Sequence, residues 1–314
     1  MSTWTLHGRH VERLAATFAA AAILSGCPSF HGERIPEPTP PSSLHTQFLT
    51  VDGVALRVLV DGPADAPTVV LLHGFGSSLD TWRDLIPELT PRHRVIALDL
   101  KGFGLSARPP GDYSPEAEAA LVRGVMDQLG VKHAAIVAHS WGSSVALALA
   151  MTNPERVTRL ALYGAWIYDA QLPPFFRWAK ADLIGEALFA LYYKERPDER
   201  MARAFFDPER IDEAYVARVE AELDRPGTVA AALAAVRGAD LLRLAAGYAN
   251  VQQPTLLLWG REDRVSALQF GERLAVDLPH AELRVFPRCG HFPHVEAREA
   301  STAALLDFLI AESP

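Results

Sequence analysis

Three residues far apart in the chain carry side chains that together could perform nucleophilic chemistry: Ser140, Asp263 and His291. A serine hydroxyl is a weak nucleophile unless a base accepts its proton, and a histidine base works best when a carboxylate orients its ring. We therefore assign Ser140 as the nucleophile, His291 as the base and Asp263 as the acid that orients the base. The predicted chemistry is acyl transfer to water, which needs no cofactor.

The segment around Ser140 joins an apolar run to a run of small residues. Residues 134–139 resemble a strand buried on both faces, and residues 145–151 are rich in Ala and Leu, as in a buried helix. A serine on the sharp turn between such elements projects its hydroxyl above the sheet, so the positions two before and two after it must be small. These positions are Ala138 and Gly142, which means that alanine replaces the usual first glycine.

A glycine-rich segment, His73-Gly74-Phe75-Gly76, follows another predicted strand. Ligands of open parallel sheets bind at the carboxyl ends of the strands, and the glycines free the backbone to point its amides into a cleft there. We expect the N–H groups of Phe75 and Trp141 to hold the oxyanion of a tetrahedral intermediate.

Asp263 and His291 also come soon after predicted strands. Glu262 is interpreted as a solvated loop charge, and Asp240 is a less favoured substitute for Asp263. His294 is interpreted as structural, because a His-x-x-His pair with no evident third ligand does not indicate a metal site.

Strands alternate with helical segments over most of the chain. This order predicts an α/β fold with a mostly parallel sheet and helices on both faces. An Asp-Gly pair at 52–53 indicates a hairpin before the alternation begins. The predicted strands are 47–51, 54–60, 68–72, 94–99, 134–139, 157–163, 255–259 and 281–286, and further helices are predicted at 79–89, 114–129, 267–277 and 297–311.

About ninety residues separate the strands 157–163 and 255–259, and their pattern is helical. Such a length exceeds a simple crossover, so we predict an inserted helical cap at about 167–250. From Tyr163 to Phe206, 11 of 44 residues are aromatic, against 27 of 314 in the whole chain, which predicts that the cap walls an apolar substrate pocket. Trp166 is the predicted substrate-binding residue of this segment.

The first 27 residues differ from the rest. Arg9 and Arg13 precede an apolar run at 14–24, and the ending Leu-Ser-Gly-Cys resembles the lipobox of bacterial lipoproteins, in which the cysteine, here Cys27, is lipidated. Residues 28–43 contain five prolines in sixteen residues and are predicted to be an extended linker. These features predict an envelope enzyme with a lipid anchor in the membrane. The lipoprotein resemblance implies the periplasmic side of the outer membrane, because Pro28 follows the cysteine in place of the aspartate that in this family often signals retention at the inner membrane. The alternative is an N-terminal extension on a cytoplasmic enzyme.

Composition limits the possible partners. The net charge is −8 and no Lys/Arg-rich stretch stands out, so a nucleic-acid partner is not expected. The two cysteines, Cys27 and Cys289, lack the paired spacings of zinc sites or disulfide frameworks, so no metal is expected, and Cys289 is predicted to be a buried small residue. The sequence does not indicate an oligomeric state.

The order Ser140, Asp263, His291, together with the His73 to Gly76 segment, is similar to that of the α/β-hydrolase fold family. The resemblance covers residues 44–314 and implies a serine hydrolase with a small-molecule substrate. We expect an ester with an apolar acyl or aromatic part. Carbon-carbon bond hydrolysis and small-peptide hydrolysis are the alternatives within the family, and a non-catalytic envelope binding module is the alternative of another class.

Overall fold

The structure, a computed structural model, describes three ranges of the chain: 44–193, 197–211 and 213–311. The predicted leader at 1–27, with Cys27, and the linker at 28–43 lie outside the described residues. None of the helices that the structure describes is long and apolar enough to cross a membrane.

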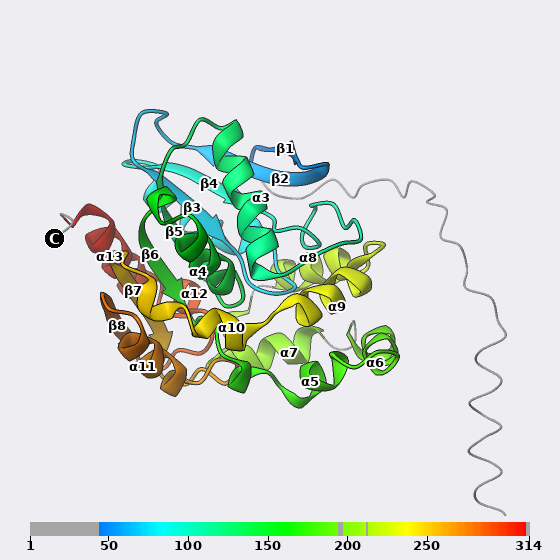
Figure 1. Ribbon diagram of the computed structural model, residues 1–314. Coiled ribbons are helices and arrows are strands. Elements are labelled where there is room, and N and C mark those ends of the chain that lie inside the picture. Colours follow the sequence, from blue (N-terminus) through cyan, green and yellow to red (C-terminus); the bar gives the residue numbers. More distant parts are fainter. Residues whose placement is uncertain (1–43, 194–196, 212, 312–314) are drawn as a thin grey trace, which may run out of the picture. The chain divides into compact units, whose positions relative to one another are not determined.

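Eight strands form one sheet in the order β1-β2-β4-β3-β5-β6-β7-β8 (Figure 1). β2 pairs antiparallel with β1 and β4, and all other neighbouring pairs are parallel. The predicted mostly parallel sheet is therefore confirmed. The strands are β1 (Thr46–Val51), β2 (Val54–Asp61), β3 (Thr68–Leu72), β4 (Arg94–Leu98), β5 (Ala134–His139), β6 (Val157–Tyr163), β7 (Thr255–Gly260) and β8 (Ala281–Phe286).

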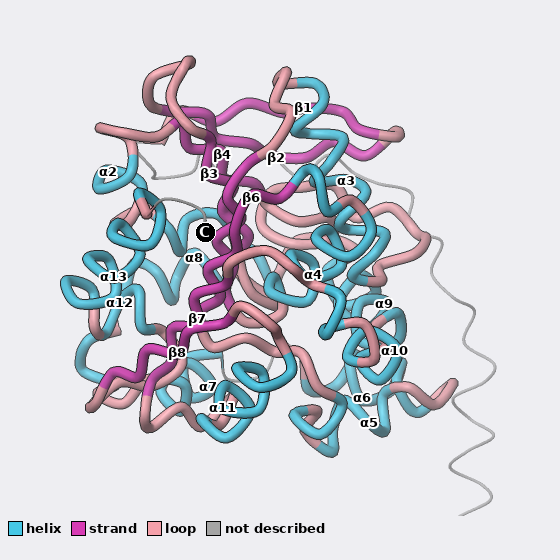
Figure 2. Tube along the Cα trace, turned by 60° about the vertical axis from the view of Figure 1, so that its left-hand side comes forward, coloured by secondary structure: helices cyan, strands magenta, loops and turns pink. Residues whose placement is uncertain are grey.

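Helices cover both faces of this sheet, which runs through the middle of Figure 2. The central strands β5 and β7 are buried along their whole length, which explains why they are almost entirely apolar. One face is covered by α3 (Pro115–Gln128), α4 (Gly142–Thr152) and α11 (Leu268–Asp277), and the other by α2 (Ile86–Leu89), α12 (Pro293–Glu296) and α13 (Arg298–Ile310).

One predicted helix is divided in two. The sequence predicts a helix over 79–89, but the structure has a 3-10 helix, η1 (Leu79–Trp82), followed by α2. Pro87 lies in the first turn of α2, where its missing N–H is tolerated, so a helix starts there more easily than it continues through. All four residues of η1 are buried, and this short element brings polar side chains close to the site.

Between β6 and β7 the described residues form helices and no strand. They gather on one side of the molecule in Figure 1 and have a small apolar core of their own around Phe189 and Val219. We call residues 167–250 the cap. Its helices are η3 (Asp169–Gln171), α5 (Pro174–Ala179), α6 (Ile184–Tyr192), α7 (Pro197–Ala204), η4 (Pro208–Arg210), α8 (Glu213–Leu223), α9 (Thr228–Gly238), α10 (Leu241–Ala245) and η5 (Tyr248–Asn250).

The two ends of the cap meet. The hydroxyl of Tyr248 donates a hydrogen bond of 2.8 Å to the carbonyl oxygen of Ile167. Both residues are fully buried in the main apolar core. The chain therefore leaves the sheet after β6 and returns to it before β7 at one anchored point.

Candidate active site

Ser140 lies on the turn between β5 and α4 with a backbone φ of +51°, a left-handed conformation that is strained for any residue with a side chain. The surrounding backbone holds this conformation. The Ser140 N–H donates to Tyr163 O (2.9 Å), and Ser140 O accepts from Ser143 N and Trp166 N (both 3.0 Å). The serine is therefore fixed from both sides, by its own helix and by the loop after β6.

The small residues around the serine are required by close backbone approaches. A Cβ on Gly142 would lie 2.4 Å from His73 O, and a Cβ on Gly74 would lie 3.0 Å from Ser140 Cβ. Ala138, which replaces the usual glycine, is completely buried in the core. The extra methyl group is thus accommodated at that position.

The structure brings Asp263 and His291 together. Asp263 Oδ2 accepts a hydrogen bond of 2.8 Å from His291 Nδ1, while Asp263 Oδ1 accepts from Val265 N and Ser266 N (both 2.8 Å). Both side chains are at least nine-tenths buried. With Nδ1–H donating to the carboxylate, Nε2 is left as the free acceptor, the arrangement that a general base needs.

The loop of His291 lies against the strand that carries the serine. His139, which precedes Ser140, donates from Nε2 to His291 O (2.9 Å), and the two imidazole rings are 4.7 Å apart. Within the described residues the Ser140 hydroxyl makes no hydrogen bond, and such contacts often form only when substrate binds. Burial, and then the neighbouring His291, lowers the pKa of His139, so the ring is a neutral donor.

The predicted oxyanion amides point to no acceptor in the described part of the protein, since neither Phe75 N nor Trp141 N donates a hydrogen bond there. The loop of Phe75 is fixed by His73. His73 Nε2 accepts from Leu100 N (2.9 Å), so Nδ1–H must donate to Gly74 O (2.7 Å). Burial lowers the pKa of His73, which keeps the ring in this neutral form.

The other residues considered in the sequence, His294, Asp240 and Cys289, make structural contacts or are buried. His294 contacts Thr81 Oγ1 through Nε2 (3.1 Å), and burial lowers its pKa to about 3, so it stays neutral. Asp240 caps α10 by accepting from Arg243 N (3.0 Å). Cys289 is fully buried. Glu262, interpreted above as a solvated loop charge, is only partly exposed.

Glu262 instead joins the two loops that carry the acid and the base. Its Oε2 accepts from Cys289 N (3.1 Å), and its own N–H donates to Cys289 O (3.0 Å). The interpretation of Glu262 as a solvated charge is therefore wrong.

A small apolar pocket of about 10 Å³ adjoins Trp141, the residue after the serine. The ring of Phe75 lies 5.3 to 6.3 Å from the rings of Trp141, Trp166, Phe176 and Tyr193. The pocket also contains aliphatic residues of the cap: Leu172, Ala235, Val236, Ala239 and Leu241. The predicted substrate residue Trp166 thus lies in an apolar wall.

Polar side chains also lie beside the segment His73 to Gly76, which we call the oxyanion loop after its predicted role. Ser77 Oγ lies 3.1 Å from the hydroxyl of Tyr215 on α8, and the guanidinium carbon of Arg218 is 5.8 Å from the Tyr215 ring. A cleft of about 460 Å³ opens beside Tyr215 and Phe292, between the sheet domain and the cap. The cleft walls include Arg83 and Arg210 among carboxylates and aromatic rings.

Residues 67–297 match the family model of the alpha/beta hydrolase fold. The chain belongs to this family. A curated relative is 2-hydroxy-6-oxo-2,4-heptadienoate hydrolase of Pseudomonas putida, which is 33% identical over 78% of this chain and 89% of the relative.

Two solved structures are similar to this α/β hydrolase. One is 2-hydroxy-6-oxo-6-phenylhexa-2,4-dienoate hydrolase from Rhodococcus, with a TM-score of 0.74, 27% identity, and coverage of 85% of this chain and 99% of that chain. The other is a membrane phospholipase A, with a TM-score of 0.69, 27% identity, and coverage of 85% and 86%.

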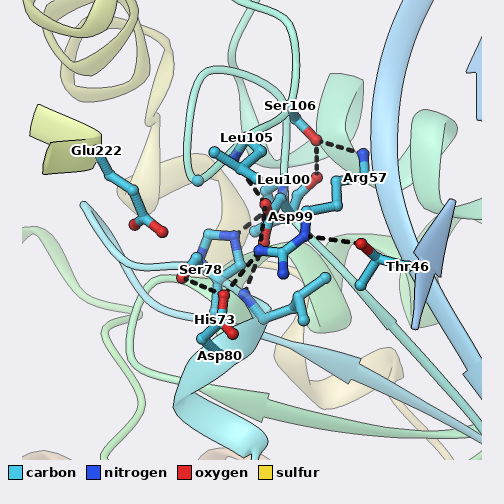
Figure 3. A network of polar contacts seen from close by, with 12 residues as sticks. Thr46, Arg57, His73, Ser78, Asp80, Asp99, Leu100, Leu105, Ser106 and Glu222 are labelled. Carbon is cyan, nitrogen blue, oxygen red and sulfur yellow. Dashed lines mark hydrogen bonds and ion pairs between the residues drawn. The ribbon is translucent and has the colours of Figure 1, made fainter. Parts of the chain in front are cut away.

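A buried ionic network supports the oxyanion loop of this α/β hydrolase (Figure 3). Asp99 accepts from Leu79 N and Leu105 N (both 2.7 Å), and Arg57 Nη1 lies 2.7 Å from Asp80 Oδ2 and 3.6 Å from Asp99 Oδ2. Because buried charges must be paired, the three charged side chains are held in one geometry.

The side chain of Glu222 on α8 points from the cap toward this network (Figure 3). Burial, and then the negative charges of Asp99 and Asp80, raises the pKa of Glu222 to about 8. The side chain is therefore uncharged at neutral pH, which makes its burial against two carboxylates tolerable. Sequence analysis missed Glu222, Tyr215 and Arg218, because all three lie in a helical stretch without a motif.

Proposed function

We propose that this protein is a serine hydrolase that cleaves a carbon-carbon bond beside a ketone in a 2-hydroxy-6-oxo-dienoate. The alternative of carbon-carbon hydrolysis is thus favoured over the ester expected from the sequence. Two of the similar proteins are named as hydrolases of such dienoates. The single observation that carries the proposal is the division of the site between the apolar pocket that Phe75 lines and the polar Tyr215 and Arg218 near Ser77.

This division fits a molecule with different ends. A dienoate has a carboxylate at one end, which needs a cation or several hydrogen-bond donors, and a ketone substituent at the other. We assign the carboxylate to the side of Ser77, Tyr215 and Arg218. The ketone substituent then lies against Trp166 and Phe176, where a phenyl or alkyl group is favoured by the apolar surroundings and enters as these side chains move apart from the pocket of about 10 Å³.

In the proposed mechanism His291 takes the proton of Ser140, and the serine oxygen attacks the ketone carbon. The N–H groups of Phe75 and Trp141 stabilise the oxyanion. Collapse of the tetrahedral intermediate breaks the carbon-carbon bond. The electron pair of that bond passes into the conjugated fragment, and this fragment takes a proton from His291. Water then hydrolyses the acyl-enzyme with His291 as base, so the net reaction adds one water. Asp263 holds the His291 tautomer throughout.

The test compares two substrates on the wild-type protein and on Arg218→Gln. We expect turnover of 2-hydroxy-6-oxo-6-phenylhexa-2,4-dienoate, followed by loss of its absorbance, and a KM about 10-fold higher in Arg218→Gln because a cation near the carboxylate is lost. Turnover of an uncharged p-nitrophenyl ester should be unchanged by the substitution.

The control is Arg177→Gln, which removes an exposed cation from α5 of the cap. It should leave both substrates unaffected. No detectable dienoate cleavage by a folded wild-type protein, with good ester turnover, would refute the carbon-carbon proposal.

Ester hydrolysis is the second candidate. The apolar pocket around Phe75 measures about 10 Å³, so it would accept an acyl chain once its side chains move apart, and one similar structure is named a membrane phospholipase A. This candidate predicts that the kcat/KM for p-nitrophenyl esters rises with acyl chain length and exceeds that for the dienoate. Both candidates use the same Ser140, His291 and Asp263.

We also propose, from the sequence alone, that Cys27 is lipidated and anchors the enzyme at the periplasmic side of the outer membrane. Metabolic palmitate labelling of the full-length chain in a bacterial host should label the membrane fraction, and Cys27→Ser should remove the label. An unlabelled wild-type chain in the cytosol that retains residues 1–26 would refute the anchor and leave the hydrolase proposal intact.

A further inference from the structure

Glu296, five residues after His291, has a buried carboxylate that neither the predicted chemistry nor the apolar pocket uses. Its Oε1 accepts from Gly290 N (2.9 Å) and Phe292 N (3.4 Å), the two residues that flank His291. Its Oε2 accepts from Phe206 N (2.7 Å), which belongs to the cap. One carboxylate therefore holds both sides of the base residue and a segment of the cap.

The same cap segment also contacts the base directly. The His291 N–H donates to Ala204 O (2.7 Å), and Arg210 Nη1 donates to Glu296 O (2.8 Å). Gly290 makes this approach possible, because a Cβ there would lie 2.3 Å from Ala204 O and 2.7 Å from Phe206 N. The contact is mostly backbone against backbone, and among the residues that the structure describes Glu296 is the one whose side-chain carboxylate bonds to both parts.

We propose that Glu296 is a positioning residue. It couples the docking of the cap segment around Phe206 to the position of the catalytic base. It acts through His291 and does not touch the substrate. The inference rests on the proposed function in so far as His291 is the base. When the cap segment lies against the His291 loop, Glu296 Oε2 accepts a hydrogen bond from Phe206 N. The carboxylate is then fixed in position, and its Oε1 holds the loop of His291. When the segment moves away, the carboxylate and the His291 loop lose that support.

The geometry requires a carboxylate. Glutamine has one acceptor oxygen and one NH₂ group, so in Glu296→Gln a donor must face either Phe206 N–H or Gly290 N–H. Either orientation breaks one side of the link, whereas Glu296→Ala breaks both. Base misplacement of about 1 Å can cost on the order of 100-fold in rate.

The experiment measures the rate at which a fluorophosphonate labels Ser140, because labelling requires the base and needs no knowledge of the natural substrate. We expect Glu296→Gln to lower this rate about 10-fold and Glu296→Ala about 100-fold. With the substrate that the wild type turns over, kcat should fall by similar factors while KM changes less than 3-fold. Glu299→Gln, an exposed carboxylate at the start of α13, is the matched control and should behave as wild type.

A second measurement tests the link to the cap. Hydrogen exchange of the backbone at 204–207 should be at least about 10-fold faster in Glu296→Ala, which removes the acceptor of Phe206 N, with exchange in β5 and β7 unchanged, which shows that the protein remains folded. A folded Glu296→Gln protein with the wild-type labelling rate would overturn the proposal. So would a Glu296→Ala protein with a reduced labelling rate but unchanged exchange at 204–207. A wild-type protein that takes no label would instead remove the proposed function and, with it, this inference.

Discussion

Ser140→Ala should lower kcat by at least about 10⁴-fold and abolish fluorophosphonate labelling, because alanine keeps the strained turn but has no hydroxyl to attack the carbonyl. The fold should remain, since Ser140 is held through its backbone N–H and C=O, and its side chain makes no hydrogen bond in the described residues. Residual turnover above the uncatalysed rate, on the order of 10³-fold, is expected from the oxyanion amides and substrate binding.

The matched control is Ser143→Ala on the next turn of the chain. The buried Ser143 hydroxyl has no hydrogen-bond partner among the described residues, so its removal should change neither labelling nor turnover. An alanine variant at Ser140 with wild-type turnover would eliminate the nucleophile assignment. Labelling of Ser140 in the wild type would also argue against the non-catalytic binding module.

Asp263→Asn should lower kcat by about 10³- to 10⁴-fold with little change in the amount of folded protein. An amide NH₂ in place of Oδ2 would face His291 Nδ1–H, so the imidazole would be driven to the tautomer with its proton on Nε2, which cannot accept from serine. Because the amide oxygen can still accept from Val265 N and Ser266 N, the loop should keep its shape.

Asp240→Asn is the control for this substitution, since asparagine caps a helix about as well as aspartate. It should leave kcat unchanged. If Asp240→Asn were the more damaging to chemistry in steady-state kinetics, the assignment of the orienting acid would be wrong.

The strands and the segments that follow them could be predicted from the sequence because their signals are local. A short apolar run with a glycine or a polar residue at its end identifies both a strand and its carboxyl end, and Ser140, Asp263 and His291 all stand soon after such runs. The same logic placed Phe75 at a strand end. The predicted roles of these residues await the substitutions described above.

Residues that act through distant contacts could not be predicted. Glu222 and Glu296 look like ordinary helical carboxylates in the sequence, yet each is buried by a segment far away in the chain. Glu262 was misjudged for the same reason, because its partner Cys289 lies on another loop. The break in the helix predicted over 79–89 could not be predicted from apolar spacing, which is helical on both sides of it. The ion pair of Asp80 in η1 with Arg57, 23 residues earlier, is likewise a distant contact.

The meeting of the cap's two ends at Tyr248 and Ile167 has an evolutionary consequence. An insertion whose ends lie side by side can be exchanged, lengthened or rebuilt without altering the register of β6 and β7. Selection can therefore alter the cap, and with it the choice of substrate, while the strands that carry the nucleophile and the acid remain as they are. In such a family the sheet reflects common ancestry, whereas the insert reflects substrate preference. The cap is therefore the part to compare when family members are classified by substrate specificity.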